Sequence, residues 1–136
     1  MSRKPYVFIA LVLLLLLLCW PRGFDSQKQI ELRSRIHATR DQIQIYESAL
    51  KRYETDNGNF PTTEQGLQAL VALPTRAPVP QNWNGPYVKP PIVRKDFWNH
   101  DFIYFNPGHH NTTTYDLFSH GPDGIQGNRD DIRNWQ

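Results

Sequence analysis

Three aspartates near the C-terminus form the pattern with the clearest potential for chemistry. Asp123, Asp130 and Asp131 lie on one polar, glycine-containing segment. Their carboxylates are hard oxygen ligands, and backbone carbonyls freed by the turns could complete the about six to eight oxygens that calcium takes. Adjacent carboxylates repel one another unless they are neutralised, which Arg129 and Arg133 could do in part. The pattern indicates a calcium loop, with a solvated surface loop as the alternative because the spacing does not match an EF-hand.

Two other kinds of chemistry find less support in the residues. His109 and His110 could suggest a transition metal, but adjacent side chains point apart on a strand and zinc needs about three or four ligands, which favours a polar turn. The single cysteine, Cys19, lies inside an apolar run, and no nucleophile motif is present. We therefore expect a protein that is not an enzyme and that has no internal disulfide.

Composition narrows the class further. A chain of 136 residues has room for one small domain. The formal net charge is +2, and the basic residues are scattered along the chain instead of forming one block. Nucleic-acid binding is thereby excluded.

The N-terminal region has the pattern of a segment that enters a membrane. Tyr6–Trp20 is an unbroken apolar run preceded by Arg3 and Lys4, which predicts export with the N-terminus inside. The run is shorter than the about 20 residues of a usual spanning helix, and no small-residue cleavage pattern follows it. We predict a membrane anchor or signal segment over residues 1–22 and an exported, folded domain over residues 23–136.

One long helix and a late hairpin are expected to position the acidic loop. Residues 26–56 contain neither proline nor glycine, and their apolar and aromatic residues follow one helical stripe. Residues 102–105 and 115–118 are rich in aromatic and branched residues on either side of turn formers, which predicts an antiparallel hairpin. A type I turn is expected at residues 121–124, followed by a polar loop to Trp135.

The region between the helix and the hairpin has signals of its own. Thr62 and Gln65 have capping-box spacing, which predicts a short second helix. Residues 74–91 contain several prolines, which predicts an irregular loop pinned by Trp83 and Tyr87.

Spaced motifs along the second part of the chain resemble one family. They run in order over about residues 45–136 and are Phe60–Leu70, Trp83 with Gly85-Pro86-Tyr87, Asn106-Pro107-Gly108, Tyr115-Asp116, Ser119, Gly121-x-Asp123-Gly124 and Asp130-Asp131-Ile132-x-Asn134-Trp135. With these motifs the chain resembles the G-type major pseudopilins of type II secretion systems. The resemblance implies a pilin-like α+β fold, in which a long N-terminal helix packs on a small antiparallel sheet.

The same resemblance implies a calcium site and partners. The ligands would be the side chains of Asp123, Asp130 and Asp131 with the backbone carbonyls of His120 and Asn128. The implied function is that of a calcium-stabilised structural subunit in protein secretion. Its partners would be other pseudopilins or inner-membrane secretion components. It would lie in the bacterial inner membrane, held through residues 6–20, with a periplasmic domain.

Two departures from the family pattern leave alternatives open. The turn at Asp96–Phe102 lacks the prolines and the glycine of the family, so a local rearrangement is expected there. The apolar run precedes Gly23-Phe24 instead of following it, and the fifth residue from Phe24 is Lys28. The first alternative is a stand-alone, soluble periplasmic calcium-binding adaptor that no longer polymerises. The second is a ligand-binding protein that uses the aromatic residues around Trp83.

Overall fold

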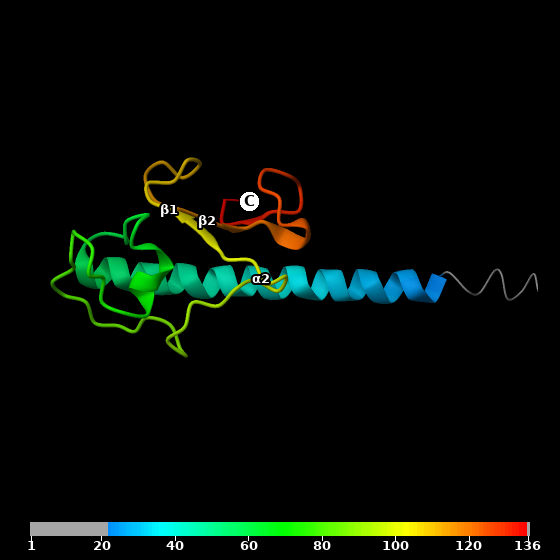
Figure 1. Ribbon diagram of the computed structural model, residues 1–136, viewed down its shortest axis with the longest axis horizontal. Helices are drawn as coiled ribbons and strands as arrows, with labels where there is room; N and C mark the ends of the chain where they lie inside the picture. Colours follow the sequence, from blue (N-terminus) through cyan, green and yellow to red (C-terminus); the bar gives the residue numbers. More distant parts are fainter. Residues whose placement is uncertain (1–21, 136) are drawn as a thin grey trace, which may run out of the picture. The chain divides into compact units, whose positions relative to one another are not determined.

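The computed structural model describes residues 22–135 and divides after Ser34 into two compact units. Its elements are the helix α2 (Arg22–Asn57), the 3-10 helix η1 (Gly66–Leu70), the strands β1 (Ile103–Phe105) and β2 (Asp116–Ser119), the 3-10 helix η2 (Gly121–Asp123) and the strand β3 (Ile132–Arg133). Figure 1 shows them in chain order from blue to red. The second unit begins at Arg35 and contains all of these strands.

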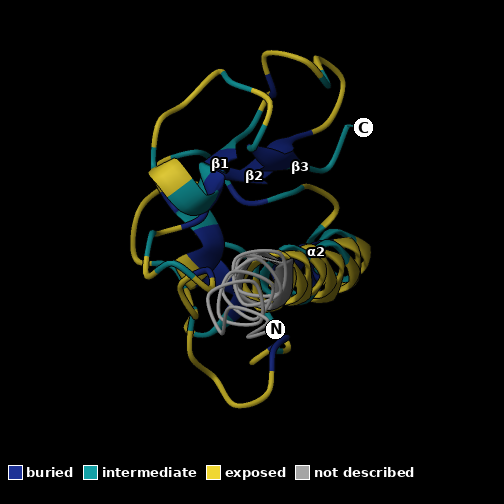
Figure 2. Cartoon of the chain, turned by 90° about the vertical axis from the view of Figure 1, so that its right-hand side faces the viewer, coloured by how far each residue is buried: buried dark blue, intermediate teal, exposed yellow. Residues whose placement is uncertain are grey.

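The long helix was predicted correctly, apart from its start at Arg22 instead of Ser26. The apolar stripe becomes buried from Thr39 to Tyr53, while the opposite face stays exposed along the helix (Figure 2). Gly58 ends the helix at φ +80°, and its amide donates to the Glu54 carbonyl at 2.7 Å.

The predicted anchor over residues 1–22 falls almost wholly outside the described residues, including the apolar run Tyr6–Trp20. Within residues 22–135, no helix is both long and apolar enough to cross a membrane.

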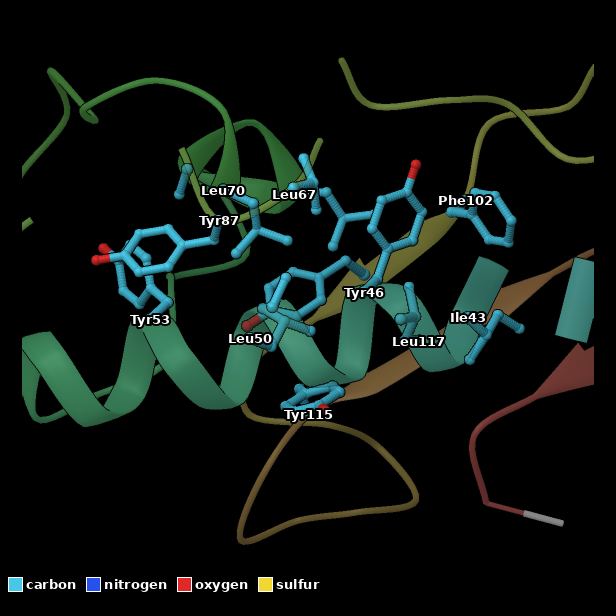
Figure 3. Close-up of a cluster of buried hydrophobic side chains, with 14 of the residues drawn as sticks. Ile43, Tyr46, Leu50, Tyr53, Leu67, Leu70, Tyr87, Phe102, Tyr115 and Leu117 are labelled. Atoms are coloured by element: carbon cyan, nitrogen blue, oxygen red, sulfur yellow. The ribbon is translucent and has the colours of Figure 1, made fainter. Parts of the chain in front are cut away.

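The core forms where α2 meets η1 and the sheet. Figure 3 shows Tyr46 and Leu50 of the helix among Leu70 of η1 and Leu117 of β2, and all four side chains are fully buried. Tyr46 also meets Phe102 edge to face, with ring centroids 5.3 Å apart. The helix stripe therefore covers the sheet through large aromatic and aliphatic side chains.

The segment between the helix and the sheet is held by side-chain hydrogen bonds. Thr62 and Gln65 form the predicted reciprocal capping box, at 3.0 and 3.2 Å, although the helix that comes next is of the 3-10 type. In the proline-rich loop, Trp83 Nε1 donates to the Ala69 carbonyl at 2.8 Å and its ring meets buried Tyr87 at 5.8 Å. These aromatic residues act as packing anchors, as predicted.

The sheet contains one strand more than the sequence predicted. The hairpin of β1 and β2 is confirmed, with Tyr104 opposite Leu117. The polar loop expected up to Trp135 is a wrong prediction, because Ile132–Arg133 pairs antiparallel with β2 as β3. Asn134 extends this pairing, since its Oδ1 accepts from the Leu117 amide at 2.9 Å. In Figure 1 the C-terminal segment, orange to red, returns alongside β2.

Candidate functional site

The start of the acidic loop, residues 120–131, is fixed by a buried polar cluster. Ser119 Oγ donates to Asp96 Oδ2 at 2.6 Å and accepts from the Gly121 amide at 3.0 Å. Asp96 Oδ1 accepts from the amides of Trp98 and His100 at 2.9 and 2.8 Å. One buried carboxylate thus joins the end of β2 to the turn that begins at Asp96.

That turn lies in Asp96–Phe102, the segment for which a local rearrangement is expected. Asn99 adopts φ +69°, the left-handed conformation that a short polar side chain tolerates. The amide of Asp96 donates to the His100 carbonyl at 2.9 Å. Side-chain capping and a left-handed asparagine therefore close the turn.

The two ends of the acidic loop meet at Gly121. Its φ is +67°, and a Cβ at this position would collide with the carbonyl oxygen of Asp130. Further along, Asn128 bridges the loop, because its Nδ2 donates to Asp123 Oδ2 at 2.6 Å and its Oδ1 accepts from the Asp130 amide at 3.1 Å. The predicted turn at residues 121–124 is η2, ended by left-handed Gly124.

The most buried acid of the loop is Asp131, which is 4% exposed. Its Oδ2 accepts from the Gly127 amide at 2.8 Å and from Arg133 Nη2 at 2.8 Å. The same Nη2 atom donates to the backbone carbonyl of Asn128 at 2.6 Å. Asp131 Oδ1 is also buried, and it has no hydrogen-bond partner among the described residues. A buried carboxylate oxygen without a partner is costly, so Asp131 Oδ1 still needs a hydrogen-bond donor or a cation.

Only part of the predicted ligand set comes together. The Asn128 carbonyl and the Asp131 carboxylate converge on one nitrogen atom. Asp123 is exposed and Asp130 half-buried, and the ring of His120 packs against Phe118 at 5.5 Å. Within residues 22–135, no group of three or more His, Cys, Asp or Glu side chains is placed to hold a metal ion. The calcium ligand set therefore stays a prediction.

A cleft gives solvent access to the buried end of the loop. Its volume is about 410 Å³, and Asp131, Arg133 and Trp135 form one part of its lining. His110 lines another part and stacks on Trp135, with centroids 4.3 Å apart. His109 packs instead against Phe105 at 5.0 Å, so the adjacent histidines have different partners, and both lie in the hairpin turn that was predicted.

The hairpin turn beside this cleft depends on another buried carboxylate. Asp116 is 1% exposed, and it accepts from the amides of His110 and Asn111 at 2.8 and 2.9 Å. Burial alone would raise the pKa of Asp116, but these amides and the His110 side chain hold the pKa below its usual value. The charged carboxylate is therefore the form that the folded turn stabilises.

Comparison with known proteins assigns the chain to a family. A sequence-family model described as "Type II secretion system (T2SS), protein G" matches residues 28–135, which is more than half of the chain. The chain belongs to the type II secretion system protein G family. The predicted resemblance is confirmed, and the match includes the acidic loop.

Individual members of the protein G family are also similar to this chain in sequence. Type II secretion system core protein G of Escherichia coli K12 is 46% identical over 94 residues, which are 68% of this chain. The same-named protein of Pectobacterium carotovorum is 43% identical over 106 residues, or 77% of the chain. The chain spans only 62% and 65% of the lengths of these two relatives.

A solved structure supports the fold. The crystal structure of the major pseudopilin from the type 2 secretion system of enterohaemorrhagic Escherichia coli is 37% identical, with a TM-score of 0.70. The match covers 79% of this chain and 87% of that one. The expected α+β architecture, a long helix with a small antiparallel sheet, is thus confirmed as pilin-like.

Proposed function

We propose that this chain is a structural subunit of a type II secretion system, a major pseudopilin that acts in protein secretion and has no catalytic role. The match of the protein G family to residues 28–135 is the observation that carries this proposal. The similarity to a solved major pseudopilin over most of that chain supports it. The partners would be other pseudopilins or inner-membrane components of the secretion system, and we expect no nucleic acid among them.

The proposed place of the protein is the bacterial envelope. Residues 6–20 would hold it in the inner membrane, with Arg3 and Lys4 on the cytoplasmic side and the folded body in the periplasm. The alternative is a soluble periplasmic calcium-binding adaptor. The position of Gly23-Phe24 after the apolar run favours this alternative, because cleavage there would leave a helix start that carries Lys28 and Glu31.

A complementation experiment distinguishes the membrane-tethered subunit from the soluble periplasmic adaptor. A host that lacks its own copy of this protein would receive either the full chain or residues 23–136 behind a cleavable secretory signal. A tethered subunit predicts that only the full chain restores secretion and co-purifies with the inner-membrane components. Its mature mass should then include the apolar segment. If both forms restore secretion equally, or the mature protein starts beyond Trp20, membrane tethering is wrong.

Calcium binding is the second part of the proposal. The ligands would be the side chains of Asp123, Asp130 and Asp131 with the carbonyls of His120 and Asn128. The partnerless buried Oδ1 of Asp131 supports a cation at this end of the loop. The Asn128 carbonyl lies close enough to share it, since this carbonyl and Asp131 Oδ2 both accept from Arg133 Nη2. A bound calcium ion would give Asp131 Oδ1 the partner that it lacks.

Thermal unfolding tests this part directly. The full chain would be melted in EGTA, in calcium and in magnesium, with the unfolding temperature as the readout. An ion that binds only the folded state at about 100 times its Kd adds about 2.7 kcal/mol of stability. For a small domain that raises the unfolding temperature by about 10 °C or more. Magnesium should do less, because it demands a stricter geometry. An unfolding temperature that is the same in EGTA and calcium would overturn the calcium proposal.

A further inference from the structure

The acidic loop already contains a cation of its own. Arg133 places a single atom, Nη2, 2.6 Å from the Asn128 carbonyl oxygen and 2.8 Å from Asp131 Oδ2. Asp131 is buried, whereas the Arg133 side chain keeps 22% of its surface exposed to solvent. A point of positive charge between a backbone carbonyl and a buried carboxylate is also what a bound metal ion would provide.

We infer that Arg133 is the resident counter-ion of this loop, and that a calcium ion binds only after the guanidinium group has left Asn128 and Asp131. The inference rests on the proposed calcium site and adds a control element to it. The protein would exchange one cation for another, so that the loop is ordered in both states. Calcium would then change stability less than it would in a loop without the arginine.

One contact pattern and one electrostatic argument make it unfavourable for Arg133 and a calcium ion to bind these oxygens at the same time. The oxygens that Arg133 contacts belong to two of the predicted calcium ligands, Asn128 and Asp131. A guanidinium group and a divalent ion on the same carboxylate would also repel each other across a short distance in a partly buried site.

The displaced side chain has a place to go. The guanidinium carbon of Arg133 lies 5.8 Å from the centroid of the Trp135 ring, within the range of a cation–π contact. Both residues line the cleft of about 410 Å³, which is open to solvent. Arg133 can therefore leave the two oxygens and keep a favourable partner.

The same loop offers a matched control. Arg129 carries the same charge and lies in sequence between Asn128 and Asp131, but its side chain is exposed. Removing either arginine changes the net charge of the loop equally. Only removal of Arg133 takes away the donor to the Asn128 carbonyl and Asp131.

The experiment compares the full-length wild type with R133Q, R129Q and R133K. Each protein is melted in EGTA and in calcium, and calcium binding is measured by calorimetry on the folded protein. In EGTA, R133Q should unfold at least about 5 °C below the wild type, because the buried Asp131 carboxylate loses its charged partner and keeps only the Gly127 amide. R133Q should bind calcium at least about tenfold more tightly than the wild type and gain more from it, since nothing has to be displaced. R129Q should stay close to the wild type in both respects, and R133K should lie between R133Q and the wild type.

The outcomes separate this inference from the calcium proposal. If R133Q melts like the wild type in EGTA, Arg133 is not the counter-ion and the inference is wrong. If R133Q is destabilised but binds calcium with the wild-type affinity, the arginine and the ion do not compete and the exchange is wrong. If R133Q is destabilised and none of the proteins binds calcium, the calcium proposal fails while the counter-ion role is supported. Should R133Q not fold, R133K decides, since weaker competition must still tighten calcium binding.

Discussion

Two loops of this body each close around one buried carboxylate, but they satisfy it differently. The hairpin turn between β1 and β2 closes on Asp116. This carboxylate accepts from the backbone amides of His110 and Asn111 and also contacts the His110 side chain. The acidic loop, residues 120–131, closes on Asp131, where one oxygen receives Gly127 and Arg133 and the other has no partner among the described residues.

The difference separates a loop closed by backbone amides from one whose carboxylate is also held by a charged side chain. Backbone amides are fixed by the chain and cannot be exchanged, so the turn around Asp116 needs nothing from solution. A guanidinium group on a flexible side chain can be replaced by another cation. The acidic loop is therefore the part of the body where an ion could influence stability.

Replacing a glycine should break either loop most severely. Gly121→Ala combines a left-handed φ with a collision against the Asp130 carbonyl, and we expect a loss of about 4 kcal/mol of unfolding free energy. Gly108→Ala places a Cβ 2.5 Å from Asp116 Oδ1, and about 3 kcal/mol should be lost. Urea denaturation measures both losses.

Gly127→Ala is the control, because its φ is +94° but no atom lies within 4 Å of the added Cβ. It should lose only the about 1–2 kcal/mol of backbone strain. A loss as large as that of Gly121→Ala would show that conformation alone, and not the close approach to Asp130, explains the glycine.

Asp116→Asn should cause the next largest loss of stability, and this loss should be the same with and without calcium. The amide keeps one acceptor oxygen but turns a donor toward the amides of the turn, so we expect about 2 kcal/mol less stability, measured by urea denaturation. Asp101→Asn is the control, since Asp101 is 80% exposed and only 3.7 Å from Lys95 in a surface ion pair. If added calcium restored the Asp116 variant, the two loops would not be independent and the comparison would fail.

The pH dependence of the same variant is a weaker but more specific effect. The folded state lowers the pKa of Asp116 below its usual 3.8, so the carboxylate stabilises the protein fully above the unfolded pKa. This contribution is lost as the pH falls through the folded pKa. The stability gap between the wild type and Asp116→Asn should be constant near neutral pH and narrow below about pH 4. A gap that widens in acid would mean that the carboxylate is not the stabilised form.

The sequence predicted the elements whose signals are local. The stripe of α2, the capping box at Thr62 and the aromatic hairpin strands depend on residues close to one another in the chain, and all were found. The strand β3 was missed because its signal lies elsewhere. Ile132–Arg133 is a strand only because it pairs with β2. The polar residues around it give no strand pattern of their own in the sequence.

The site was predicted in composition but not in arrangement. The carboxylates and the need to neutralise them were evident, and Arg133 was one of two candidate partners. Nothing local could show that Asp131 is buried while Asp123 is exposed, because burial depends on how β3 docks. Nor could spacing show that Arg133 reaches Asn128 while Arg129 points to solvent.

Asp123→Asn should give the smallest effect in the absence of calcium and the sharpest test of the ligand set. Asp123 is exposed, and its Oδ1 accepts from the Ile125 amide at 2.9 Å, a bond that an asparagine can also accept. Its Oδ2 accepts from Asn128 Nδ2 at 2.6 Å, and the variant loses this surface bond. In EGTA we therefore expect a loss of only about 0.5–1 kcal/mol. If Asp123 is a ligand, the loss of one negative charge should weaken calcium binding by about tenfold. Calorimetry at fixed ionic strength measures this. An unchanged calcium affinity would remove Asp123 from the ligand set. The buried Asp131 would then be the main carboxylate ligand, although the exposed Asp123 is easier for an ion to reach.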